Sequence, residues 1–490
     1  MCDFLVHSLL QNSALKTPNE ICVQYKNDSW SYIELYNHCL KIKKYLDEII
    51  VVERRNIGIH FNNDPSFLIS FFGILMAGHT VVPIPYYSTQ TEVERIIHFC
   101  DIKILFTDKK FSSTHVNTTD VSFVVSRYRN NTLDFKSPLI NKNSPALILP
   151  TSGSTGDPKF VMLSHYNIYS NAIAHGREIQ HNSNDIFIIT MPLSFSSTIT
   201  TQILSCIYSN VKFHIVPLPL FPRAILNYIE KYKINCLAAV PSFLMNLIEA
   251  IESYNYKIDF KLSFITISGA PVTQRLNKQL KEIFPKTDVI QTYGLTEASP
   301  RVTMMRRGYQ KLCCGKPVDG VEIKINKQES KREGEISVRG VNIMIGYYKN
   351  KKLTQSTFNK NWLRTGDIGY LDSDGDLHLI GRKKNIIISG GINIYPEEIE
   401  EFFFNQIGVI QSMVIGEKHY ILGESPVVYL TINNEFNIKN IYNQSTKFLS
   451  RYKIPKRWYK VKNIPLNNTG KVIRTFKPEL LHSEVILDLL

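Results

Sequence analysis

The sequence predicts an α/β protein with a large N-terminal domain and a small, mobile α+β domain at its C-terminal end. In the first 300 residues, apolar or β-branched runs alternate with segments of helical spacing, which is typical of a parallel sheet covered by helices. From about Gly315, short alternating strands punctuated by Gly and Asp predict a small antiparallel, β-barrel-like subdomain. The 490 residues also exceed what one hydrophobic core usually organises. We therefore expect domains at residues 1–382 and 383–490.

The βα winding runs through the whole N-terminal part. Apolar runs predict strands at residues 56–60, 80–84, 186–191, 211–216, 236–240, 264–268 and 289–292. Helical spacing predicts helices at residues 32–50, 67–77, 222–231 and 242–252, and polar composition predicts surface loops at 109–120 and 141–144. Ligands bind at the carboxyl ends of the strands in such sheets, so the polar residues that follow these strands are candidates for a site.

The remaining strands and helices are shorter. Strands are expected at residues 321–325, 334–339 and 376–380 of the subdomain, and near 412–415 and 426–432 of the C-terminal domain, with a helix at 396–404. The longest apolar run, residues 67–77, is about half of what a membrane span needs, so we expect a buried helix and no transmembrane segment. The N-terminus has no secretory signal pattern, which favours the cytoplasm.

Charge and cysteine content narrow the class of partner. Lys and Arg number 57 against 43 Asp and Glu, a net charge of +14, and residues 447–477 contain no acidic residue. Such an excess is compatible with nucleic acid, a membrane surface or an acidic protein. No basic motif interleaved with aromatic residues is present, which disfavours nucleic acid. The eight cysteines lack paired metal-ligand spacing and are expected to be buried free thiols.

Residues 151–159, Thr-Ser-Gly-Ser-Thr-Gly-Asp-Pro-Lys, form a loop suited to an anion. Its glycines let a phosphate reach backbone N–H groups, its hydroxyls add donors, and its lysine adds a mobile positive charge. The residues are Thr151, Ser152, Gly153, Ser154, Thr155, Gly156 and Lys159. The loop lacks the Walker A spacing, and by itself such a cluster is also typical of a solvated turn.

Three downstream segments give this loop a chemical context. Residues 293–297, Tyr-Gly-Leu-Thr-Glu, offer a ring on which adenine could stack, a hydroxyl for a phosphate and a carboxylate for Mg²⁺. Asp367 follows a tight turn, and one carboxylate can accept both hydroxyls of a ribose. Lys471 lies beside Gly470 in the basic tail. Taken singly, these are also compatible with a turn, a β-turn aspartate and a surface lysine.

In this order the motifs resemble those of the adenylate-forming superfamily of acyl-CoA synthetases, standalone adenylation domains and luciferases. The resemblance extends from about residue 8 to 478 and rests on residues 151–159, 192–197, 268–271, 293–297, 334–340, 364–367, 381–400 and 468–471. It implies that a carboxylic acid attacks ATP to give an acyl-adenylate and pyrophosphate. The acyl group then passes to a thiol.

The resemblance also implies a role for each matching residue. The loop with Lys159 would embrace the β- and γ-phosphates. Gly269, Ala270 and Pro271 would line the adenine, Tyr293 would stack on it, Thr296 would contact the α-phosphate, Glu297 would bind Mg²⁺, Asp367 and Arg382 would hold the ribose, Lys384 would be the hinge between the domains, and Lys471 would be the catalytic lysine.

Some positions depart from the family pattern. Phe160 replaces a glycine after the loop lysine, Phe195 stands where many acyl-CoA synthetases have His, and Ser196 stands where α-amino-acid-activating domains have Asp. A buried ammonium without that carboxylate would be costly, which disfavours α-amino acids and favours an aliphatic or aryl acid. The expected pocket residues are Phe195, Ser196, Ser197, Val240, Ser242 and Gln291.

Two candidates remain for the thiol that accepts the acyl group. Coenzyme A is expected first, because many standalone members use it. The alternative is the phosphopantetheine of an acyl or peptidyl carrier protein, since such partners are acidic and the tail is basic. A catalytically idle nucleotide-binding protein is disfavoured because Glu297, Asp367 and Lys471 are all present.

Overall fold

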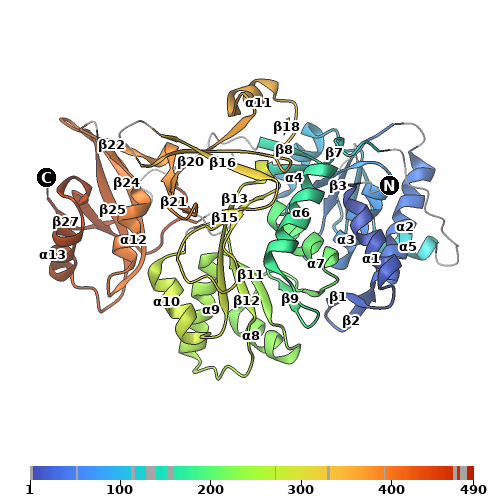
Figure 1. Ribbon diagram of the computed structural model, residues 1–490, viewed down its shortest axis with the longest axis horizontal. Helices are drawn as coiled ribbons and strands as arrows, with labels where there is room; N and C mark the ends of the chain where they lie inside the picture. The colour runs from blue at the N-terminus through green and yellow to red at the C-terminus, as the bar shows by residue number, and fades with distance from the viewer. Residues whose placement is uncertain are drawn as a thin grey trace.

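A computed structural model describes most of the chain, in four sheets covered by helices (Figure 1). The described residues are 4–50, 53–111, 116–128, 140–151, 159–270, 272–327, 332–390, 392–466, 472–474 and 483–489. The predicted α/β class and the separate C-terminal α+β unit are confirmed. No helix within these ranges is long and apolar enough to cross a membrane.

The nine-stranded sheet carries most of the predicted site. Its order is β15 (Lys316–Pro317), β14 (Arg301–Met304), β13 (Asp288–Gly294), β12 (Phe264–Ile267), β11 (Cys236–Ala239), β9 (Ile186–Ile189), β10 (Lys212–Ile215), β1 (Ile21–Tyr25) and β2 (Asp28–Ser31). The strands from β13 to β1 are parallel, as the βα winding predicts. The N-terminal strand β1 therefore pairs with β10, almost two hundred residues away in the sequence.

A seven-stranded sheet contains the hairpin that carries the glycine loop. Its order is β18 (Gly346–Tyr347), β8 (Lys159–Ser164), β7 (Pro145–Thr151), β4 (Thr80–Pro83), β3 (Asn56–His60), β5 (Ile104–Thr107) and β6 (Asn117–Thr119). β7 and β8 are antiparallel, and Thr151 lies opposite Lys159 at the open end of the hairpin. The prediction of an unbroken loop at 109–120 is wrong at β6, which forms the edge of this sheet and pairs with β5.

Helices cover both large sheets. The largest hydrophobic core extends from one of these sheets to the other. It includes residues of the first three helices, α6 and the π-helix η1. The helices are α1 (Val6–Lys16), α2 (Tyr32–Ile49), α3 (Pro65–Met76), α4 (Gln90–Phe99), α5 (Val121–Arg127), α6 (His165–Ile179), η1 (Thr198–Leu204), α7 (Ser205–Tyr208), α8 (Pro222–Lys231), α9 (Pro241–Ser253), α10 (Gln274–Ile283) and the 3₁₀ turn η2 (Thr296–Ala298). Ser31 and Glu34 form a capping box on α2, which supports the predicted start of this helix.

The antiparallel subdomain is an open sheet. Its order is β16 (Val321–Lys327), β17 (Gly334–Gly340), β20 (Trp362–Leu371) and β19 (Phe358–Asn359), and β21 (Leu377–Arg382) also pairs with β20. The predicted antiparallel pairing is confirmed, but the pairing among the described residues does not close these strands into a barrel. The short helix α11 (Lys351–Thr357) lies at its edge (Figure 1).

The C-terminal unit packs its helices on a six-stranded sheet. The order is β23 (Ile392–Ile394), β22 (Ile387–Ser389), β25 (Gly423–Ile432), β26 (Arg457–Lys460) and β27 (Glu484–Asp488), with β24 (Val409–His419) also paired to β25. Its helices are η3 (Lys383–Asn385), α12 (Pro396–Phe404), α13 (Ile438–Phe448) and η4 (Arg451–Lys453). Trp458 and Phe403 meet edge to face in a core separate from that of the large sheets.

Phe160, the unusual residue after the loop lysine, points away from the loop. Side chains alternate along β8, so Lys159 and Phe160 face opposite sides of the sheet. The Phe160 ring is buried and stacks on Phe99, with centroids 4.7 Å apart. The residue therefore contributes to the packing beneath α4 and does not project toward a ligand on the Lys159 side.

We expect Phe160→Ala to lower the free energy of unfolding by about 3–5 kcal/mol, because it leaves a cavity beneath α4. Chemical denaturation measures this change. Phe123→Ala is the matched control, since that ring is 57% exposed, and it should change stability by less than about 0.5 kcal/mol. Equal effects of the two substitutions would contradict the packing assigned to Phe160.

Candidate active site

The predicted site residues gather at the carboxyl edge of the nine-stranded sheet. β13, β12, β11 and β9 are successive parallel strands, so the segments that follow them lie at one edge. These segments hold η2 after β13, Gly269 and Ala270 after β12, Val240 and Ser242 after β11, and Phe195 to Ser197 after β9. Gly269 and Ala270 are exposed there, and Gly269 has a φ of +89°, which glycine adopts without strain.

A buried hydrogen bond connects this edge to the antiparallel subdomain. The Tyr293 hydroxyl, at the end of β13, donates to Asp367 Oδ2 at 2.7 Å, and Arg382 Nε lies 2.6 Å from Asp367 Oδ1. Asp367 and Arg382 are register partners on β20 and β21. Burial, followed by the charge of Asp367, raises the pKa of Tyr293 well above its usual value, so the hydroxyl keeps its proton. The two residues expected to hold the ribose are therefore in direct contact.

Gly294, in the segment 293–297, is required by a close approach within the chain. A side chain at Gly294 would lie 1.9 Å from the carbonyl oxygen of Pro300, and 3.3 Å from Cα of Arg301. The close approach is thus made by the chain itself, where β13 meets β14. This contact turns the chain so that Thr296 and Glu297 lie half-buried at the sheet edge.

Glu297 of η2 and Lys159 of β8 both lie next to Tyr347. The Tyr347 hydroxyl donates to Glu297 Oε1 at 2.8 Å, and Lys159 Nζ lies 5.7 Å from the centre of the Tyr347 ring. The pairing of β18 with β8 places Tyr347 opposite Val161, two residues from Lys159. A carboxylate that could bind a metal ion and a cation that could bind phosphate thus border one region.

The structure brings several residues of the predicted acid pocket close together. The hydroxyls of Ser196 and Thr296 share a hydrogen bond of 3.2 Å, and Ser196 is buried. Phe195, Ser197, Val240 and Ser242 are half-buried at the same edge. Gln291 is buried deeper, where its amide donates to Cys314 Sγ at 3.3 Å. Its place in the pocket therefore stays a prediction.

Several basic side chains converge between the large domain and the C-terminal unit. The pKa of Lys384, in η3, lies below its usual value, mainly because of partial burial. Nearby positive charge lowers it further, and this charge belongs to Arg382, Lys159 and Arg474. The predicted hinge lysine and the predicted loop lysine are thus close enough to repel each other. Such a region favours an anionic ligand.

The remaining predicted site residues lie outside the described residues. They are Ser152, Gly153, Ser154, Thr155, Gly156, Pro271 and Lys471, and their assignments stay predictions. Thr151 is described and lies at the base of the glycine loop, where its hydroxyl donates to the carbonyl of Lys159 at 3.2 Å.

The sequence interpretation missed an ion-pair cluster next to the hinge. Arg474 Nη2 lies 2.5 Å from Glu400 Oε2 and 3.7 Å from Glu397 Oε1, and Asn385 donates to the same Glu397 oxygen at 2.7 Å. Glu397 and Glu400 are three residues apart on α12 and so share one helix face. That spacing, with an arginine three residues after Lys471, was the available signal.

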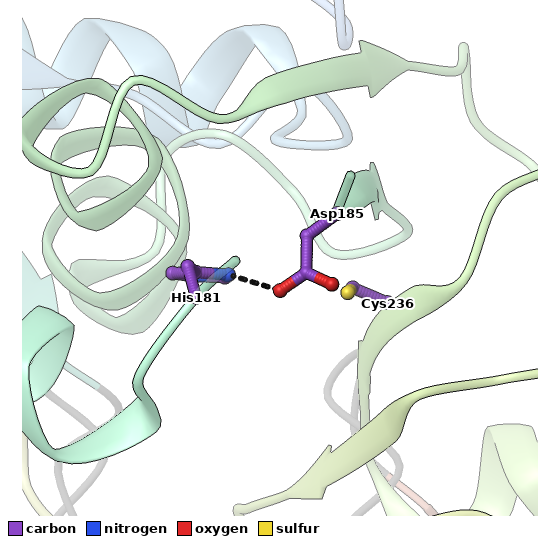
Figure 2. A group of neighbouring side chains, drawn as sticks. All are labelled: His181, Asp185 and Cys236. Atoms are coloured by element: carbon purple, nitrogen blue, oxygen red, sulfur yellow. Dashed lines mark hydrogen bonds and ion pairs between the residues drawn. The ribbon is translucent and has the colours of Figure 1, made fainter. Parts of the chain in front are cut away.

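A second polar group lies at the opposite edge of the sheet. Figure 2 shows His181, Asp185 and Cys236 turned toward one another, with His181 Nδ1 3.3 Å from Asp185 Oδ2. Burial opposes ionisation of Asp185, but hydrogen bonds from His181 and the Asn182 backbone lower its pKa overall. Burial raises the pKa of Cys236, which remains a thiol. Because Asp185 and Cys236 stand at the starts of β9 and β11, we assign the group to anchoring the preceding loop.

The cysteine prediction is confirmed for the described residues. All seven cysteines within them are buried and free, and Cys2 lies outside the described residues.

Comparison with protein families agrees with the motif series. The family model described as "AMP-binding enzyme" matches residues 10–348, and the model described as "AMP-binding enzyme C-terminal domain" matches residues 398–471. The chain belongs to the AMP-binding enzymes. The predicted membership of the adenylate-forming superfamily is therefore confirmed.

Curated relatives of this AMP-binding enzyme are named as ligases. It is 27% identical over 485 residues to a 2-succinylbenzoate–CoA ligase of Bacillus pumilus, covering 95% of this chain and 96% of the relative. A 2-succinylbenzoate–CoA ligase of Bacillus subtilis is 26% identical over 489 residues, covering 95% of this chain and 96% of the relative. The predicted class, an AMP-forming acid–thiol ligase, is thereby confirmed.

Solved structures share the fold of this AMP-binding enzyme. One is the o-succinylbenzoate coenzyme A synthetase of Bacillus subtilis in complex with AMP, with a TM-score of 0.84, 24% identity and coverage of 96% of this chain and 98% of that one. Another is ATP-bound MatB from Rhodopseudomonas palustris, with a TM-score of 0.86, 22% identity and coverage of 96% and 97%.

The Arg474 cluster predicts a pH dependence of stability in the C-terminal unit. Burial raises the pKa of Glu400 from 4.5 to about 7, and Glu397 adds to this increase. Between these pH values the folded state binds more protons than the unfolded state. The contribution of Glu400 to the free energy of unfolding should therefore fall as pH rises through this window, by up to about 1.4 kcal/mol per pH unit. Buried histidines such as His7 and His60, whose pKa values are lowered by burial, contribute in the opposite direction.

Chemical denaturation of this AMP-binding enzyme between pH 5 and 7.5 measures that slope. Glu400→Gln removes the titrating proton and leaves the histidines unchanged, so the free energy of unfolding should fall less, or rise more, with pH than in the wild-type protein. Glu398→Gln, on the exposed side of the same helix, should leave the slope unchanged. The same slope in Glu400→Gln and in the wild-type protein would contradict the assignment to Glu400.

Proposed function

We propose that this enzyme activates a carboxylic acid with ATP and transfers the acyl group to coenzyme A. In the first step a carboxylate oxygen forms a bond to the α-phosphorus of ATP, and the bond to the β-phosphate oxygen breaks, releasing pyrophosphate. In the second step the coenzyme A sulfur bonds to the acyl carbon, AMP leaves, and the thiol proton passes to solvent. Both steps bring anions together, so the site must supply positive charge.

The convergence of basic side chains at the domain junction is the observation that carries this proposal. Lys159, Arg382 and Lys384 come from three separate elements, and the charges of Arg382 and Lys159 add to the effect of partial burial in lowering the pKa of Lys384. A triphosphate placed among them would relieve that repulsion. Ribose at Asp367 would then hold the phosphates on the side of Lys159, with adenine along Gly269 to Pro271 and Tyr293.

Glu297 is suited to bind Mg²⁺ beside the phosphates. Its carboxylate is half-buried, is held by the Tyr347 hydroxyl at 2.8 Å, and lies beside the region of Lys159. When bound, Mg²⁺ neutralises phosphate charge as pyrophosphate departs. Thr296, linked to Ser196, would direct its hydroxyl to the α-phosphate where the acid meets it.

Lys471 is proposed as the lysine that bridges the acid carboxylate and the α-phosphate. The domain boundary is proposed at residues 382 and 383, with Lys384 as the hinge. The Arg474 cluster supports this assignment, because it fastens the segment just after Lys471 to α12, whose Glu397 contacts Asn385 of η3. A rotation at the hinge would therefore move Lys471 together with α12.

Coenzyme A is proposed as the acceptor because the two relatives are named coenzyme A ligases. The basic tail remains the one feature that favours an acidic carrier protein instead. For the acid, an aliphatic or aryl carboxylate fits a pocket edged by Phe195 and Val240. No carboxylate is hydrogen-bonded to Ser196 among the described residues, which argues against an α-amino acid.

Exchange of labelled pyrophosphate into ATP tests the first step. Purified protein with Mg²⁺ should catalyse this exchange only when a suitable acid from a broad aliphatic and aryl panel is present. The best acid should then give a thioester with coenzyme A, detected by mass spectrometry. No exchange with any acid would refute the activity, and thioester formed only on a carrier protein would refute the proposed acceptor.

Two substitutions should separate the two steps. Lys471→Ala removes a charge used mainly in the adenylation transition state, so pyrophosphate exchange should fall by about 10²–10³-fold. Thioester formation from supplied acyl-adenylate should remain in this variant. Lys384→Pro restricts the hinge, so it should preserve exchange and abolish thioester formation. Lys462→Ala, an exposed lysine of the basic tail, is the control, and equal loss of both steps in either site variant would contradict its assigned role.

A further inference from the structure

Arg301 is a buried cation without a counter-ion among the described residues. It stands at the start of β14, and only 4% of its surface is exposed. Its Nη2 makes one long hydrogen bond, 3.4 Å to the Thr201 hydroxyl, and its Nε has no partner within the described ranges. Burial lowers the pKa of Arg301 to about 9. A buried charge of this kind is costly unless another group neutralises it.

The backbone at Arg301 is firmly held, so the position of the side chain is determined by the fold. Asn171 of α6 donates to the Arg301 carbonyl at 2.8 Å and accepts from its N–H at 2.9 Å. Asn342 also donates to the same carbonyl, at 3.1 Å. These three hydrogen bonds fix the point from which the Arg301 side chain extends.

Arg301 lies one helical turn from the proposed acid site. Thr201, its hydrogen-bond partner, also donates to the carbonyl of Ser197 at 2.7 Å. The preceding residue, Ser196, shares a hydrogen bond with Thr296. The start of η1 and the two serines before it therefore connect the guanidinium to the proposed site of α-phosphate attack.

The surroundings of Arg301 hold further unsatisfied polar atoms. η1 is a π-helix, a form that occurs frequently at functional sites. Its Thr198 and Thr200 hydroxyls and Gln202 Oε1 are buried without partners among the described residues. His175 lies near Arg301, and burial, followed by the charge of Arg301, lowers its pKa well below the usual value. His175 is thus neutral and adds no competing charge.

We propose that Arg301 pairs with a second carboxylate of the acid, so that the preferred substrate is a dicarboxylic acid. One carboxylate is activated at Thr296. The other forms an ion pair with Arg301 and accepts further hydrogen bonds from hydroxyls of η1. This inference rests on the proposed function and specifies its substrate class. An acid without the second carboxylate would leave the guanidinium buried and unpaired, and the site would reject it.

Pyrophosphate exchange with acids matched in length tests the pairing. The pairs are glutarate with valerate, adipate with hexanoate, and phenyl acids with and without a second carboxylate. The wild-type protein should prefer the dicarboxylate in at least one pair by about 10²-fold in kcat/KM. Arg301→Gln should abolish this preference, mainly through KM, and Arg301→Lys should keep part of it. Arg339→Gln, an exposed arginine paired with Glu322, should leave the preference unchanged.

The melting temperature without ligand separates this role from a structural one. Arg301→Met removes an unpaired buried charge, so its Tm should equal or exceed that of the wild-type protein. A clear fall in Tm, or an unchanged dicarboxylate preference in Arg301→Gln, would overturn the proposal. Failure of the proposed function would give a different result: neither the wild-type protein nor the variants would catalyse pyrophosphate exchange with any acid. In that case the Tm of Arg301→Met would still show whether the Arg301 guanidinium is an unpaired buried charge in the ligand-free protein.

Discussion

The hydrogen bond from Tyr293 to Asp367 is the interaction on which the rest of the site depends. It joins the end of the parallel strand β13 to β20 of the antiparallel sheet. Asp367 is 3% exposed, and a carboxylate this deep is stable only when its oxygens are satisfied. Tyr293 satisfies one oxygen and Arg382 the other. Because Arg382 directly precedes η3, the same contact fixes where the C-terminal unit begins.

Charge at this junction matters more than the net charge of the chain. The value of +14 alone is compatible with several kinds of partner. The positions of the charges say more about the ligand than the net charge does. The fold brings Lys159 and Arg382 near Lys384. Arg474 is different, since it contacts the carboxyl groups of Glu397 and Glu400. Among the described residues, Lys159 and Lys384 form no ion pair and are thus left for a ligand, whereas Arg382 and Arg474 also hold the protein together.

The sequence predicted local features well and long-range ones poorly, for a physical reason. Strands and helices of the parallel sheet follow from the periodicity of neighbouring residues, and the site motifs follow from their order. The pairing of β1 with β10, in contrast, depends on contacts across almost two hundred residues. Phe160 looked like a change in the phosphate loop, yet its ring packs against Phe99 on the other face of the strand. In the sequence, no pattern distinguishes Arg301 from the other arginines, and only the fold shows that it is buried.

A buried, unpaired cation is understandable where specificity matters more than stability. A nonpolar residue at position 301 would pack between α6 and η1 without an electrostatic penalty, and it would admit any acid of suitable length. A guanidinium destabilises the resting protein but also excludes neutral acids, because binding one would seal the charge away from water without a partner. Ser196 is consistent with this arrangement, since it places no carboxylate beside Thr296 to repel an acid. The sign of the charge around the pocket therefore favours anions at both ends.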